Sequence, residues 1–79
     1  MFFQRKKKII VGIEGMHCDK CALKVDRALE DLSDVDRVKV NLKKKTATVF
    51  FDHSVDEVLI QKTIEDLGYT VTGIKGFHS

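Results

Sequence analysis

The sequence predicts an α+β fold whose elements follow the order βαββαβ. Two segments repeat their apolar residues with the helical period near 3.6, and three shorter segments alternate apolar and polar residues as strands do. The chain has 79 residues, enough for one modest core. Two βαβ halves of similar length, each with one helix stripe to bury, predict a ferredoxin-like sandwich. Its four-stranded antiparallel sheet carries both helices on one face.

The first half of the chain predicts a strand, a helix and a second strand. Residues 8–14 alternate and fit a strand packed on one side. Residues 19–32 have apolar side chains at helical spacing and charged side chains on the opposite, solvent-exposed face, which predicts about three turns of helix. Residues 38–42 alternate again, and Lys43–Lys45 then form the expected tip of a hairpin. The apolar positions assigned to the core are Ile9, Val11, Ile13, Ala22, Val25, Leu29, Leu32, Val38, Val40 and Leu42.

The second half predicts a strand, a helix and a last strand. Residues 46–51 form the third strand. Ser54–Glu57 match a capping box, in which the serine hydroxyl caps the second helix. Gly68 suits a left-handed helix stop, residues 69–74 form the fourth strand, and residues 76–79 are expected to be a loose tail. The expected core positions are Ala47, Val49, Phe51, Ile60, Ile64 and Leu67, with help from Val55 or Val58.

We expect one domain over residues 1–79, with its core over about 8–75, because no stretch rich in Pro, Gly or Ser divides the chain. The apolar runs, such as Ile9–Val11, are far too short to cross a bilayer. Arg5–Lys8 resemble the charged start of a secretion signal, but no long apolar stretch follows. We therefore expect a soluble chain that stays in the cytoplasm without membrane insertion.

The charge pattern does not favour a nucleic-acid partner. The formal net charge is only +2, and the two basic clusters are typical of a solvated strand end and a solvated turn. Docking to an acidic protein surface is the main alternative for them. Only Phe2 and Phe3 flank a basic run, so no stacking platform for bases is evident.

The stretch Gly15–Cys21 contains both cysteines and lies between the first strand and the first helix. Cys18 and Cys21 are expected to meet unpaired amides and the positive end of the helix dipole, which favours thiolate. Two thiolates suit Cu(I), whereas Zn(II) usually takes four ligands. Low coordination leaves room for a third sulfur. The pattern therefore predicts a metal carrier that works by ligand exchange and needs no enzyme active site.

The predicted topology assigns the chemistry to one end of the sheet. The cysteine loop, the Lys43–Lys45 turn and the Gly68–Tyr69 junction are expected to lie together. The basic run Arg5–Lys8, His53 and the tail with His78 are expected at the opposite end. Neither histidine can then join the cysteines within one chain.

Several segments together resemble the heavy-metal-associated domain family. They are Gly15-Met16-His17-Cys18-Asp19-Lys20-Cys21, Val40-Asn41-Leu42, Phe51-Asp52 and Ile64-Glu65-Asp66-Leu67-Gly68-Tyr69. The resemblance covers roughly residues 8–75 and extends to small bacterial copper chaperones and to the metal-binding domains of copper-transporting P-type ATPases. It implies Cu(I) bound by Cys18 and Cys21 and exchange with such an ATPase. It also implies that Met16 anchors the loop and that Tyr69 approaches the metal.

The residues around the cysteines leave alternatives open. Met16 either fills the core or acts as a thioether ligand, and Tyr69 taken alone fits a packed strand residue. His17 is either exposed or a contact for metal or partner, and Asp19 either offsets the helix dipole or helps hold Zn(II) or Cd(II). Zn(II), Cd(II) or Hg(II) is therefore the alternative cargo.

Three further interpretations concern the role of the whole chain. It starts at Met1 and ends at Ser79 without a linker, which favours an independent protein over an excised ATPase domain. A thiol-disulfide oxidoreductase is less favoured, since such enzymes usually place a cis-proline beside their thiols and this chain has no proline. Because two sulfurs leave Cu(I) unsaturated, two chains could also share the ion as a metal-bridged homodimer.

Overall fold

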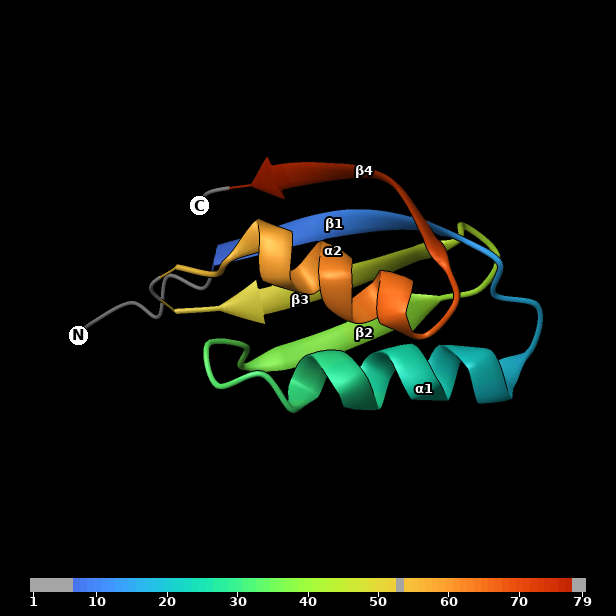
Figure 1. Cartoon of the computed structure of the whole chain (residues 1–79). Coiled ribbons are helices and arrows are strands. Elements are labelled where there is room, and N and C mark those ends of the chain that lie inside the picture. The colour runs from blue at the N-terminus through green and yellow to red at the C-terminus, as the bar shows by residue number, and fades with distance from the viewer. Residues whose placement is uncertain (1–6, 53, 78–79) are drawn as a thin grey trace.

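The computed structural model describes residues 7–52 and 54–77, and its elements follow the predicted order (Figure 1). None of the helices in these ranges is long and apolar enough to cross a membrane. The elements are β1 (Lys7–Glu14), α1 (Asp19–Glu30), β2 (Arg37–Asn41), β3 (Thr46–Phe51), α2 (Glu57–Asp66) and β4 (Thr70–Phe77).

The four strands form one sheet in the order β2-β3-β1-β4, and every neighbouring pair is antiparallel. Strands β1 and β2 consequently run parallel to each other with β3 between them. Both helices cover the same face of the sheet (Figure 1). The predicted ferredoxin-like sandwich is confirmed.

The hydrophobic core lies between that sheet face and the two helices. Alternation along β1 and β3 directs every second side chain into it, and α1 and α2 each contribute two fully buried residues one helical turn apart. Each such aliphatic side chain contributes about 1.5–3 kcal/mol by leaving water. The buried residues are Ile9, Val11, Ile13, Met16, Val25, Leu29, Val38, Ala47, Val49, Phe51, Ile60 and Ile64.

The predicted start of the second helix is wrong. Asp56, not Ser54, caps α2, because its Oδ1 accepts hydrogen bonds from the amides of Val58 at 3.0 Å and Leu59 at 3.2 Å. A carboxylate directly before the first helical residue satisfies two free amides and also meets the positive end of the dipole. Val58 is 68% exposed, so Val55 is the residue that packs against the core.

Two predicted ends also differ from the structure. Helix α1 ends at Glu30 rather than Leu32, with Asp31 as its C-cap. The predicted loose tail is wrong for its first two residues, because β4 continues to Phe77 and pairs Gly76 with Ile9. Backbone hydrogen bonds to β1 extend this strand without any need for an apolar side chain.

The cap gives a direct test of the corrected helix start. We expect Asp56→Ala to lower the free energy of unfolding by about 1 kcal/mol, because two helix amides lose their acceptor. Ser54→Ala is the matched control and should change it by less than about 0.5 kcal/mol, as surface substitutions usually do. Urea titration followed by circular dichroism measures both, and a larger loss for Ser54→Ala would contradict the assignment.

Candidate metal centre

The two cysteines meet at the N-terminus of α1. Cys18 is the N-cap residue, with φ −152°, and Cys21 lies in the first helical turn. Both thiols are free, and the Cys18 thiol donates to Cys21 Sγ across 3.7 Å. This separation is less than twice a metal–sulfur bond of about 2.3 Å, so both sulfurs can reach one ion. Cys18 is exposed and Cys21 half-buried, which leaves the pair open to an incoming ligand.

The surroundings of Cys21 favour its thiolate. Its pKa is lowered to about 7, first by a hydrogen bond from the His17 backbone amide and then by the Tyr69 hydroxyl and the Cys18 thiol. Cys21 therefore loses its proton at a lower pH than an ordinary cysteine. The sequence predicted a thiolate from unpaired amides and the helix dipole, and the structure identifies the donors as the amides of His17 and Cys18, the Tyr69 hydroxyl and the Cys18 thiol.

Tyr69 lies beside Cys21. It follows Gly68, which ends α2 with φ +97°. The pKa of Tyr69 is raised, chiefly because its hydroxyl donates to Cys21 and secondly because of burial. The phenol consequently keeps its proton and acts as a donor to the sulfur.

Gly15 makes room for that tyrosine. Its φ is +108°, and a Cβ added there would lie 3.0 Å from Tyr69 Cδ1. A side chain at this position would be strained and would press on the ring. Sequence reasoning missed this role of Gly15 and the donation by the His17 amide. The position of Gly15, between an alternating strand and the CxxC pair, was the sequence signal that could have indicated its role.

The structure separates the other candidate residues by burial. Met16 is 4% exposed and belongs to the hydrophobic core, which supports the anchoring role. His17 and Asp19 are exposed. Within residues 7–52 and 54–77, no cluster of three or more His, Cys, Asp or Glu side chains is placed to hold a metal ion. Neither His17 nor Asp19 completes a three-donor site with the two cysteines.

Contacts between segments confirm that the predicted features share one end of the sheet. The Ile13 amide donates to the Lys45 carbonyl at 2.8 Å, and Lys45 Nζ lies 3.9 Å from Glu14 Oε2. The lysine turn is thus attached to the end of β1, directly before the cysteine loop. The part of the basic run that is described, Lys7 and Lys8, pairs with β3 at the opposite end. Arg5, His53 and His78 lie outside the described residues.

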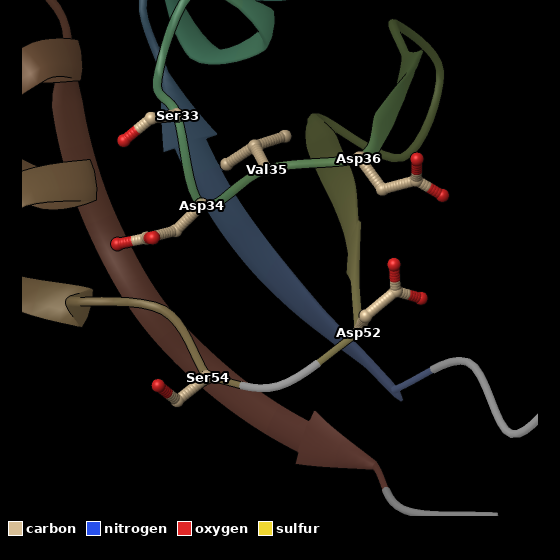
Figure 2. A pocket seen from close by; sticks show the side chains of 6 residues that line it. All are labelled: Ser33, Asp34, Val35, Asp36, Asp52 and Ser54. Carbon is tan, nitrogen blue, oxygen red and sulfur yellow. The ribbon is translucent and has the colours of Figure 1, made fainter.

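A hollow at that opposite end is remote from the cysteines. It has a volume of about 200 Å³ and is lined by Ser33, Asp34, Val35, Asp36, Asp52 and Ser54 (Figure 2). Its walls come from the segment before β2 and from the segment after β3, whereas the cysteine loop follows the other end of β1. The hollow therefore takes no part in the thiol site.

The pKa of Cys21 can be tested through Tyr69. In a Cys18→Ser background, where the remaining thiol is Cys21, Tyr69→Phe should raise this pKa because one donor is lost. A raised pKa moves thiolate formation, and any binding that requires thiolate, to higher pH. Ultraviolet thiolate absorbance across a pH titration measures the midpoint. Equal midpoints with and without the hydroxyl would contradict the hydrogen bond.

The sequence and the fold of this chain are similar to those of known metal-binding proteins. Residues 10–70 match the model of the heavy-metal-associated domain. The copper chaperone CopZ of Enterococcus hirae is 40% identical over 59 residues, which are 73% of this chain and 86% of that protein. The probable copper-exporting P-type ATPase of Archaeoglobus fulgidus is 40% identical over 62 residues, which are 77% of this chain.

The chain spans less than a tenth of the two ATPases first matched, 8% and 9% of their lengths. A solved structure described as CopZ metallochaperone superposes with a TM-score of 0.78 at 35% identity and covers 82% of this chain and 98% of that one. With a family model matched over residues 10–70 and relatives at 40% identity, the chain belongs to the heavy-metal-associated domain family.

Proposed function

We propose that this chain, as a single domain over residues 1–79, carries Cu(I) in the cytoplasm. Cys18 and Cys21 hold the ion, and ligand exchange passes it to the metal-binding domain of a copper-transporting P-type ATPase. The observation that carries the proposal is the pair of free sulfurs 3.7 Å apart at an exposed helix start. Similarity to copper chaperones and copper ATPases supports copper as the cargo.

The proposed transfer uses the low coordination of the bound ion. Two thiolates satisfy a soft ion and leave one side of it open, so a partner thiolate binds before either cysteine leaves. Exposure of Cys18 provides the approach for that partner. The protein acts here as a carrier and not as an enzyme, since no bond of a substrate other than metal–sulfur is made or broken.

Neighbouring residues shape this site in the proposal. The Tyr69 hydroxyl and the His17 amide stabilise negative charge on Cys21, while Met16 holds the loop against the core. The His17 imidazole stays in solvent and contributes no ligand. Zn(II), Cd(II) and Hg(II) are the competing cargoes. Zn(II) is disfavoured because a typical zinc site uses three or four protein ligands and the described residues gather only two here.

Copper binding is tested by titrating the reduced protein with Cu(I) against a strong chelator. Tight binding should be lost in Cys18→Ser/Cys21→Ser and kept in the control His17→Ala, because only thiolates supply ligands. X-ray absorption should show two short Cu–S distances without a nitrogen shell. Sedimentation of the same samples tests the proposed metal-bridged homodimer. Unchanged affinity in the double serine variant would refute the site.

We also propose that the Lys43–Lys45 turn steers an acidic partner domain to the metal. All three lysines are exposed and lie beside the cysteine loop. Lys45 also contacts Glu14, so it is left intact in the test.

Lys43→Glu/Lys44→Glu should slow copper transfer about ten-fold at low salt and should weaken its salt dependence. Arg27→Glu/Lys62→Glu, an equal charge change on the helices, should leave the rate within about two-fold. Stopped-flow transfer to an acidic partner domain measures both. If Arg27→Glu/Lys62→Glu slowed transfer equally, the effect would come from the net charge of the protein and not from the lysine turn.

A further inference from the structure

The sheet face that no helix covers has its own pattern of residues. Register pairs Phe50 with Lys8 on one side and with Arg37 on the other. Two residues further along β1, a continuous row crosses all four strands. It consists of Lys75, Ile10, Thr48 and Lys39. These positions alternate with the buried residues, so they share the open face.

This face carries three exposed cations, and Asp36 lines the same hollow as two of them, Arg37 and Lys39. Arg37, Lys39 and Lys75 are exposed, and within residues 7–52 and 54–77 no carboxylate forms an ion pair with any of them. Glu14 is the one acidic residue in the four strands, and its carboxylate lies beside Lys45 at 3.9 Å. The other carboxylates of the described residues lie on the helices and connecting loops.

Two apolar side chains and two hollows lie between the cations of this face. Ile10 and Phe50 are half-buried between the cations. Ile10 borders a hollow of about 380 Å³ whose lining includes the paired residues Gly12 and Gly73 and the side chain of Thr72. Phe50 borders a second one of about 300 Å³, which Arg37, Lys39 and the acidic residue Asp36 also line. An anionic partner with some apolar character fits this combination.

We propose that the open sheet face is a docking surface for an anionic phospholipid membrane. Lys39 and Lys75 stand on the two edge strands, about 14 Å apart across three strand spacings. A plane of lipid headgroups can contact the cations at both edges at the same time. Each lysine or arginine near the surface increases the membrane partition coefficient of the protein roughly five-fold. Single-stranded nucleic acid instead follows one groove and stacks successive bases, while Phe50 is the one aromatic on this face among the described side chains.

Docking through this face leaves the metal centre free. The cysteine loop continues from the end of β1, beyond the rows that carry the cations. With the sheet lying on the membrane, the cysteine loop therefore lies beside the contact area rather than within it. The docking uses neither cysteine, so it holds whether or not the chain carries copper.

Reduced, metal-free protein is mixed with vesicles of phosphatidylcholine containing one quarter phosphatidylglycerol, at low salt, and sedimented. Arg37→Gln/Lys39→Gln should bind roughly 30-fold more weakly than the unchanged protein. Lys24→Gln/Lys62→Gln removes the same charge from exposed helix positions and should bind within about three-fold of it. Thermal unfolding of all variants verifies that they fold.

A site-specific readout uses the absence of tryptophan from the chain. Thr48→Trp places an indole at the centre of the face, and its emission should shift to the blue on the anionic vesicles. Lys62→Trp, on α2, should show no shift. Pure phosphatidylcholine vesicles should shift neither.

Three results of these measurements would overturn the proposal. They are no binding to anionic vesicles, a loss of vesicle binding in Lys24→Gln/Lys62→Gln equal to that in Arg37→Gln/Lys39→Gln, or a blue shift of the emission in Lys62→Trp but not in Thr48→Trp. A single-stranded oligonucleotide that binds the face and displaces it from vesicles at equal charge concentration would assign it to nucleic acid instead. Because no metal is present, failure here leaves the copper proposal untouched, and failure of copper binding leaves this one untouched.

Discussion

The position of the candidate metal centre depends on the pairing of β1 with strands on both sides. Backbone hydrogen bonds to β3 and β4 hold this strand in the middle of the sheet, and Ile9, Val11 and Ile13 bury its inner face. Met16 continues the anchoring just beyond the strand. The cysteine loop thus leaves a rigid element at a defined point and enters α1 at once. Only seven residues, 15–21, connect the strand to the second cysteine.

In the proposed copper carrier, a short loop between rigid elements suits a site that both holds and releases an ion. The sulfurs lie 3.7 Å apart on a short loop and the first helical turn, a separation that suits joint binding of one ion. Backbone and tyrosine donors lower the pKa of Cys21, so proton loss costs little near neutral pH. Exposure of Cys18 keeps one sulfur within reach of a partner. Resistance to ligand exchange would instead require a closed shell of ligands, and the described residues hold no cluster of three or more His, Cys, Asp or Glu that could form one.

Most of the architecture could be predicted because it follows from the periodicity of side chains. Alternation in β1 and β3 and helical spacing in α1 and α2 assign the core faces, and the two cysteines mark the site. The errors fall where backbone geometry decides. Whether Ser54 or Asp56 caps α2 depends on which residue directly precedes the first turn. The end of β4 depends on a hydrogen-bonded partner rather than on its own side chains.

The supporting contacts of the site were hidden from the sequence for a similar reason. The fit between Gly15 and Tyr69 joins residues more than fifty positions apart, and a positive φ cannot be read from composition. The amide of His17 acts through the main chain, so the identity of its side chain gives no indication of that donation. The prediction that Tyr69 lies at the site came from the resemblance to a family. It did not supply the physical reason, which is the hydrogen bond to Cys21.

The cations of the open face also affect how copies of the chain meet one another. Strands β2 and β4 are the edges of the sheet, and each offers unpaired backbone groups that could extend the sheet into a second molecule. Arg37, Lys39 and Lys75 place like charges along both edges. Two copies that approach edge to edge therefore repel before their backbones can pair, which protects a small, β-rich protein from aggregation.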